Sequence, residues 1–439
     1  MTEKNVDRRQ IFCLTAIDGK TLPVELNMHI DSIGITRHRA QDSRNGQLNN
    51  EQCLSLWVSA VFVIRGALES KSIVMATLKQ ILEKHTAEGE LYEKLEDGRV
   101  RCTACAHRCR IREGAAGVCK VRFNKTGTLK VPFGYVSGTQ CDPVEKKPFF
   151  HAHPGALAFS FGMLGCDLHC GYCQNWVTSQ ALRDPRAVSS PMLASPDELI
   201  GLARKQGAEI VVSTYNEPLI TSEWAAAVFK EAKNAAMITA YVSNGNATPE
   251  VLRYLQPYLD LYKVDLKGFN DRRYRQLGGR LQPVLDTIRS LHSMGVWVEV
   301  VTLLVPGYND SEEELTKLTE FLSGISPDIP WHVTAFYKNY RMTDPENTTN
   351  ENLLTAAEIG KKSGLRFVYA GNLPGGVGPW EHTHCHRCEE LLIERYGYQI
   401  LSYSLTAQGC CPSCKTKIPG RWAKSFKPQI SAYPFNLTR

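Results

Sequence analysis

Three cysteines near the middle of the chain carry the clearest chemical signal. Cys166, Cys170 and Cys173 have the spacing C-x3-C-x2-C. Cysteine thiolates hold iron–sulfur clusters, and a 4Fe–4S cluster normally takes four of them, one on each iron. Three thiolates would leave one iron open, much as a catalytic zinc site keeps one position free. The spacing therefore predicts an iron–sulfur site with an open coordination position. From spacing alone, the alternative is a zinc knuckle or a chance cluster of thiols.

A second cysteine group precedes this motif and is also spaced for metal binding. It consists of Cys102, Cys105, Cys109 and Cys119. Four thiolates with glycines at the intervening turns predict either a closed tetrahedral zinc site or a small iron–sulfur site. The spacing does not choose between these two kinds of site.

A third group forms two C-x2-C pairs near the C-terminal end, separated by a tyrosine-rich stretch suited to a hairpin. The pairs are Cys385 with Cys388 and Cys411 with Cys414. Paired knuckles of this kind are typical of a zinc ribbon. We therefore expect zinc to hold a small C-terminal module together.

The cysteine pattern and the composition indicate a reducing compartment. Eleven of the 15 cysteines belong to the three groups, which is typical of metal sites rather than of a disulfide framework. The net charge of +6 over 439 residues is a mild basic excess, which does not favour a nucleic acid as partner. No signal peptide opens the chain, and the longest apolar run is too short to cross a bilayer. We expect a cytoplasmic protein without membrane contact.

Strand-like and helix-like segments alternate from about residue 156, which is typical of a parallel α/β fold. Strands are expected over 156–162, 209–215, 238–244, 261–267, 296–305, 331–337 and 365–370. Helices are expected between them, among others over 196–205, 223–236, 249–255, 285–294 and 311–322. Successive β-α units predict a full or partial TIM-type barrel, in which the chemistry lies at the C-terminal ends of the strands.

The chain is expected to have four parts. Residues 1–74 show no clear element and are interpreted as a poorly defined N-terminal extension, with Met75 as the expected start of the protein. Residues 75–150 would form a module around the first four-cysteine group. The core domain would span 151–371, and 372–439 would form the zinc-ribbon-like module.

Polar side chains follow the expected strands in chain order. The candidates for binding a cofactor are Glu217, Ser243, Asn244, Asp265, Lys267, Glu299 and His332. Asp265 and Lys267 share one face of their strand because strand side chains alternate. They would offer a carboxylate to hydroxyl groups and an ammonium to a carboxylate. Each candidate also has a structural interpretation: Asp265 with Lys267 as a buried ion pair, Glu299 bridging Lys263, and His332 as a hydrogen-bonded core histidine.

The three-cysteine motif resembles the signature of the radical S-adenosylmethionine (radical SAM) superfamily, and Tyr172 matches the aromatic residue that usually precedes its third cysteine. The stretch from about residue 91 to 422 is similar to the radical enzyme of the AmmeMemoRadiSam system, a relative of the pyruvate formate-lyase activating enzymes. The matching segments outside the cysteine groups are Asp142–Pro148, Thr214–Pro218, Asp265–Lys267, Pro306–Asp310 and Ile418–Trp422.

This resemblance implies a 4Fe–4S cluster on the three cysteines, with S-adenosylmethionine (SAM) chelating the open iron. Tyr172 would lie near the adenine, and Glu217, Asp265 and Lys267 would bind SAM. Reductive cleavage would give a 5′-deoxyadenosyl radical that abstracts hydrogen from an unidentified substrate. The implied partners are a flavodoxin- or ferredoxin-type electron donor and proteins with AMME or Memo domains.

Two departures from the activating enzymes favour the AmmeMemoRadiSam lineage. Their glycine-glycine-glutamate turn is here Tyr215-Asn216-Glu217, and the four-cysteine group precedes the radical motif instead of following it. Two alternative functions stay open. One is activation of a glycyl-radical protein. The other is a non-catalytic iron–sulfur or zinc protein that serves in electron transfer or as a scaffold, although a scaffold has no use for polar residues at successive strand ends.

Overall fold

The computed structural model describes residues 10–15, 21–26 and 76–423, and its contacts divide the chain into a first unit, Met1–Ala76, and a second, Thr77–Arg439. In the first unit, β1 (Gln10–Thr15) and β2 (Thr21–Leu26) pair antiparallel. No element was predicted there, although Leu22, Val24 and Leu26 alternate with other residues as strand residues do. Most of the predicted 1–74 extension, and Met75 itself, lie outside the described residues.

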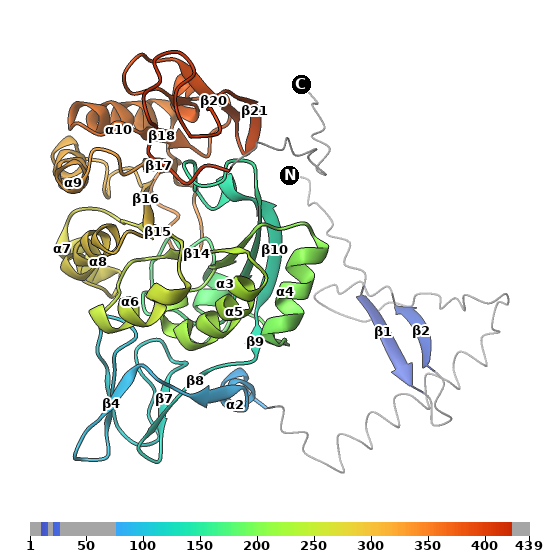
Figure 1. The fold of residues 1–439 in the computed structure, drawn as a ribbon. Helices are drawn as coiled ribbons and strands as arrows, with labels where there is room; N and C mark the ends of the chain where they lie inside the picture. The colour runs from blue at the N-terminus through green and yellow to red at the C-terminus, as the bar shows by residue number, and fades with distance from the viewer. Residues whose placement is uncertain (1–9, 16–20, 27–75, 424–439) are drawn as a thin grey trace, which may run out of the picture. The chain divides into compact units, whose positions relative to one another are not determined.

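An eight-stranded sheet organises the second unit (Figure 1). In spatial order its strands are β10 (Gly138–Pro143), β11 (Leu157–Gly162), β13 (Ile210–Ser213), β14 (Ile238–Ser243), β15 (Leu261–Asp265), β16 (Trp297–Leu304), β17 (Trp331–Ala335) and β18 (Val368–Gly371). The strands from β11 to β18 are parallel, and β10 pairs antiparallel with β11. The expected parallel strands are confirmed; each is shorter than expected, and β18 also ends one residue past its expected end. The described end strands β10 and β18 are not paired with each other, so barrel closure is not shown.

Helices cover the outer side of this curved sheet (Figure 1). They are α4 (Pro196–Lys205), α5 (Ser222–Asn234), α6 (Pro249–Leu255), α7 (Asp271–Gln276), α8 (Leu281–Ser293), α9 (Glu312–Ile325) and α10 (Asn350–Lys362). The residues that signal helix starts in the sequence form helix caps in the structure. Ser195 and Glu198 form a capping box at the start of α4, and the Thr248 and Ser311 side chains cap α6 and α9. These caps fix where each helix leaves the loop at the carboxyl end of a strand.

Two small sheets and a helix precede the core. The helix is α2 (Leu78–Glu83); one sheet comprises β3 (Thr86–Glu88), β8 (Thr128–Pro132) and β7 (Phe123–Lys125), and the other β4 (Tyr92–Lys94), β5 (Val100–Cys102) and β6 (Arg110–Ile111). A separate short pair joins β9 (Tyr135–Val136) to β12 (Met192–Leu193). Buried Arg122 of this N-terminal module donates to Glu223 of α5 at 2.6 and 2.7 Å, which ties the module to the core.

The C-terminal module consists of β19 (Thr383–His384), β20 (Leu391–Tyr396) and β21 (Gln399–Tyr403). The β20–β21 pair is the hairpin expected in the tyrosine-rich stretch. Arg395 donates to the Phe150 carbonyl at 2.9 Å, and Arg421 donates to the His151 carbonyl at 2.7 Å. The module therefore packs on the loop between β10 and β11. Within the described part of the chain, no helix has the length and apolarity that a membrane span requires.

Candidate active site

The three cysteines lie on the loop that leaves the C-terminal end of β11, between that strand and the short helix α3 (Trp176–Ser179). Cys170 and Tyr172 are buried and pack with Leu277, while Cys166 and Cys173 pack against the same cluster. Burial raises the pKa of Cys170 to about 12, although nearby Lys267 opposes this. Three thiols on one partly buried loop are the donor set that an iron–sulfur cluster with one open iron needs.

Asp167 anchors this loop, and the sequence-based prediction missed it. Its side chain is fully buried and accepts hydrogen bonds from Asn244 Nδ2 at 2.8 Å and Asn246 Nδ2 at 2.7 Å. Both asparagines follow β14, so the carboxylate ties the cysteine loop to the carboxyl end of a second strand. Two sequence features could have indicated this anchor: an acidic residue inside the three-cysteine motif, and the polar run Ser243–Asn246. Only Ser243 and Asn244 of that run were named as candidates.

Glu217 lies where β13 and β14 end and is also buried. Its carboxylate accepts from Ser243 Oγ and from the Asn244 amide, both at 2.7 Å, and from the Leu219 amide at 3.0 Å. Burial, and after it the negative charge of Asp167, raise the pKa of Glu217 to about 8. Glu217 in turn raises the pKa of Cys166, after burial and Asp167. The structure therefore brings Glu217, Ser243 and Asn244 together beside the cysteine loop.

Asp265 and Lys267 sit at the end of β15. Lys267 Nζ lies 3.7 Å from Asp265 Oδ2, and Lys263 forms a second ion pair with the same carboxylate. Burial opposes the charge of Lys267, but Asp265 and Cys170 outweigh it and raise its pKa well above the usual value. Asp265 keeps a third of its side chain exposed. The expected ion pair is present, and it lies next to the cysteine loop, where a carboxylate and an ammonium remain close to the thiols.

Glu299 and His332 lie elsewhere, near the N-terminal ends of β16 and β17. Glu299 accepts from His332 Nε2 at 2.7 Å, from Trp297 Nε1 at 3.0 Å, and from the Phe150 and His151 amides at 2.9 Å. Four donors occupy both carboxylate oxygens. Glu299 and His332, predicted to bind a cofactor, therefore do not lie in the candidate site. Their polar atoms form hydrogen bonds at the opposite end of the sheet instead. The alternative interpretation, an ion pair between Glu299 and Lys263, is not observed, because Lys263 pairs with Asp265.

The two four-cysteine groups differ in how closely their sulfurs approach. In the C-terminal group, Cys385 Sγ lies 3.5 Å from Cys414 Sγ, Cys388 Sγ lies 3.6 Å from Cys411 Sγ, and all four sulfurs lie within 4.8 Å of one another. Among the described residues, no other set of three or more cysteine, histidine or acidic ligand atoms meets that spacing.

The first group is gathered as well, but less tightly. Cys102, Cys105 and Cys119 are buried, and the half-buried Cys109 accepts from the Val118 amide at 3.4 Å. Gly117 lies against this sulfur: a Cβ on Gly117 would stand 3.4 Å from Cys109 Sγ. The metal site expected on these four cysteines stays a prediction.

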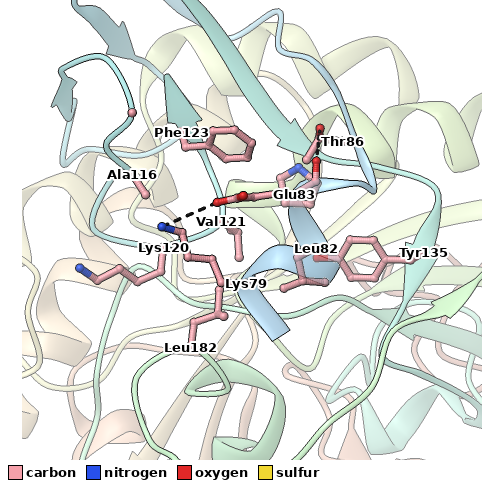
Figure 2. Close-up of a pocket in the computed structure, with 12 residues that line it drawn as sticks. Lys79, Leu82, Glu83, Thr86, Ala116, Lys120, Val121, Phe123, Tyr135 and Leu182 are labelled. Carbon is pink, nitrogen blue, oxygen red and sulfur yellow. Dashed lines mark hydrogen bonds and ion pairs between the residues drawn. The ribbon is translucent and has the colours of Figure 1, made fainter. Parts of the chain in front are cut away.

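A cavity of about 30 Å³ lies beside α2, and Figure 2 shows the side chains that line it. Lys79 and Glu83, one turn apart on α2, form an ion pair at 3.7 Å at its edge, and Leu82 and Tyr135 form part of its wall. A wider depression of about 420 Å³ lies beside it and is lined by residues such as Phe133. No cysteine lines either of these two spaces, although Gly114, Ala116 and Lys120, which line the smaller one, lie on the loop around Cys119.

Comparison with known proteins decides the family. The model of the radical SAM superfamily matches residues 162–319, which begin at the end of β11 and run into α9. An uncharacterized protein of Methanocaldococcus jannaschii is 34% identical over 334 residues, which cover 75% of this chain and 98% of that protein. The chain belongs to the radical SAM superfamily. Membership indicates an enzyme, and the superfamily implies a 4Fe–4S cluster and SAM, for which the three-cysteine loop is the fitting donor set.

Radical SAM relatives of known activity are more distant. A pyruvate formate-lyase-activating enzyme of Staphylococcus epidermidis is 27% identical over 226 residues, covering 48% of this chain and 88% of that enzyme. A solved radical SAM methyltransferase from Sphaerobacter thermophilus is 15% identical, with a TM-score of 0.41, covering 60% of this chain and 76% of the other. The resemblance to the activating enzymes is thus confirmed at the level of relatives.

The turn that replaces the glycines of the activating enzymes keeps a glycine-like backbone. Tyr215 has a φ of 71°, in the left-handed region that favours glycine. Asn216 Oδ1 accepts from the Met163 amide at 3.0 Å, and the Tyr215 hydroxyl lies 3.2 Å from Lys147 Nζ. These contacts hold a strained turn without glycines and keep Glu217 beside the cysteine loop.

Proposed function

We propose that this radical SAM protein cleaves SAM at a 4Fe–4S cluster held by Cys166, Cys170 and Cys173 and uses the resulting radical to abstract hydrogen from a substrate. The observation that carries this proposal is the convergence of the cysteine loop with Glu217 and Lys267 at the carboxyl ends of adjacent parallel strands. This is the end of a parallel β/α fold where catalytic residues gather.

The residues around the loop would divide the binding of SAM among them. Lys267, held charged by Asp265, would bind the methionine carboxylate, and Glu217 would accept from the methionine amino group. Ser243 and Asn244 would position Glu217 through their hydrogen bonds to it. Asp265 would bind the ribose hydroxyl groups.

The cofactors would supply the chemistry, and the protein would supply orientation and exclusion of water. When bound, a reduced 4Fe–4S cluster provides the electron that splits SAM into methionine and a 5′-deoxyadenosyl radical. Tyr172, which is buried and packs edge-on against Tyr308 with ring centroids 6.0 Å apart, would border the adenine. Burial of the loop would keep water from the reacting centre.

Anaerobic reconstitution with iron and sulfide, reduction by dithionite and assay of 5′-deoxyadenosine test this proposal. We expect the reconstituted protein to form 5′-deoxyadenosine from SAM and the Cys170→Ala variant to form none. Cys141→Ala is the matched control, because Cys141 is half-buried in β10 and belongs to none of the three groups. Equal product formation by wild type and Cys170→Ala would contradict the site.

A second candidate function is activation of a glycyl-radical protein, which the similarity to pyruvate formate-lyase-activating enzymes favours. The partners differ between the candidates. An activating enzyme would need a protein substrate with a glycine-radical loop, whereas the AmmeMemoRadiSam lineage would point to AMME- and Memo-domain proteins. Incubating the reduced protein and SAM with each partner class, and recording which one raises the yield of 5′-deoxyadenosine, separates them.

The C-terminal group is proposed to hold zinc. Tetrahedral coordination with a Zn–S bond of about 2.3 Å places neighbouring sulfurs about 3.8 Å apart. The 3.5 and 3.6 Å separations in this group are close to that spacing. We expect about one zinc per chain, and its loss in a Cys388→Ser variant, as measured by elemental analysis.

A further inference from the structure

The first four-cysteine group is packed directly against the three-cysteine loop. Ala106, the neighbour of Cys105, donates its amide to the Asn246 carbonyl at 2.9 Å, and the Asn246 side chain donates to Asp167 at 2.7 Å. Asp167 is adjacent in sequence to Cys166. His107 Nε2 stands 4.0 Å from the same carboxylate. One asparagine and one aspartate therefore connect a cysteine of each group.

A second connection between the two loops runs through other residues. Arg183 donates to the Val118 carbonyl at 2.5 Å and to the Leu168 carbonyl at 3.0 Å, and so clamps the segment before Cys119 to the middle of the three-cysteine loop. Gly165 approaches so closely that a Cβ there would stand 3.0 Å from the Cys119 carbonyl oxygen. The two groups thus meet along two separate sets of contacts.

The spacing between sulfurs distinguishes the first four-cysteine group from the C-terminal group, whose spacing suits zinc. A single tetrahedral ion draws all four sulfurs to about 3.8 Å from one another. The C-terminal group has nearly this spacing. Among the described residues, no three cysteines of the first group, nor the three of the three-cysteine loop, have sulfurs that all lie within 4.8 Å of one another. Wider separation is what a 4Fe–4S cluster requires, because each cysteine then binds a different iron.

We propose that Cys102, Cys105, Cys109 and Cys119 hold an iron–sulfur cluster that passes single electrons to the radical site. The electron-passing part rests on the proposed function of the three-cysteine loop. A low-potential one-electron donor protein, of the flavodoxin or ferredoxin class, would be oxidised by one electron and would reduce the four-cysteine cluster. That cluster would be reoxidised as it passes the same electron to the cluster held by Cys166, Cys170 and Cys173, which would be reduced. Zinc could not serve in this place because it has no redox chemistry.

Metal analysis of a variant without the radical site tests the cluster. In full-length protein carrying Cys166→Ala, Cys170→Ala and Cys173→Ala, reconstituted anaerobically, we expect about four iron atoms per chain to remain. Adding Cys109→Ser should remove most of this iron and its visible absorbance. Cys109 is suited to this because it is only half-buried, and Cys141→Ser is the matched control that should keep the iron. A folded triple variant with no iron, or with about two zinc atoms per chain, would overturn the proposal.

The two proposals fail in distinguishable ways. Equal iron in wild type and the triple variant would remove the proposed radical site and leave the second cluster standing. Electron paramagnetic resonance of the dithionite-reduced wild type then tests electron passage. We expect a broadened spectrum that differs from the sum of the spectra of the two single-site variants, because unpaired electrons in adjacent clusters interact. A spectrum equal to that sum would overturn the proposed electron transfer.

Discussion

Asn246 donates a hydrogen bond from Nδ2 to Oδ2 of Asp167 at 2.7 Å, and this bond joins three parts of the protein. Asp167 belongs to the three-cysteine loop, Asn246 follows β14, and the Asn246 carbonyl accepts from Ala106 of the N-terminal module. The carboxylate is fully buried and has Asn244 as a second donor. Its position makes Asp167 a positioning residue for the loop.

Asp167→Asn should therefore destabilise the protein. The substitution would place an amide nitrogen opposite the side-chain amide of Asn244 or Asn246, so a buried donor would lose its acceptor. The expected cost is about 1–3 kcal/mol in the free energy of unfolding. Urea denaturation measures this loss. Asp344→Asn is the matched control, since Asp344 is exposed, and should change stability by less than about 0.5 kcal/mol. Equal stability of wild type and Asp167→Asn would argue against the anchoring role.

Lys267→Ala should weaken SAM binding and leave the iron content unchanged. Loss of a charge-assisted hydrogen bond costs about 1.5–3 kcal/mol, which is roughly a tenfold to hundredfold rise in Kd. Titration calorimetry on the reconstituted protein gives the affinity. Lys205→Ala, at an exposed position near the end of α4, should bind SAM like wild type. Unchanged affinity with lower stability would mean that Lys267 serves only its ion pair with Asp265.

Glu217 should make stability depend on pH. Burial, followed by Asp167, raises the pKa of its carboxyl from 4.5 to about 8 in the folded protein. Its stabilising contribution is fully present below pH 4.5 and is lost as the pH rises toward 8, because the unfolded chain ionises first. Glutamine does not ionise, so the stability of wild type relative to Glu217→Gln should fall between pH 5 and 8 and then level off. Thermal unfolding across this range measures the difference, and parallel curves would refute the raised pKa.

Glu299→Gln should lower stability without changing SAM affinity. The substitution replaces one carboxylate oxygen by an amide nitrogen, which leaves at least one buried donor from His332, Trp297 or the Phe150–His151 backbone without an acceptor. The expected cost is about 1–3 kcal/mol in the free energy of unfolding. Calorimetry with SAM provides the second measurement. Weaker binding at unchanged stability would restore the cofactor role that the sequence suggested.

The parallel strands could be predicted because each is a short apolar run between helix-start signals such as Ser195 and Thr248. The edge strand β10 was not predicted. Its sequence, Gly138–Pro143, lacks an apolar run, and the strand forms because β11 offers it a free edge. Pairing of this kind depends on a partner outside the local sequence, which local patterns do not contain.

The sequence by itself determined the spacing of the cysteines and the β-α alternation, because thiol spacing and apolar periodicity are local properties. Only the tertiary structure decided which polar residues meet. Glu217 lies near Cys166 and Lys267 near Cys170, while Glu299 and His332, expected on the same grounds, lie near the opposite ends of their strands. The tertiary structure also decided that the first four-cysteine group packs against the three-cysteine loop through Asn246 and Asp167. The physical reason is that strand register decides at which end of the sheet a side chain lies. Contact between modules follows from tertiary packing. Both depend on residues distant in the chain.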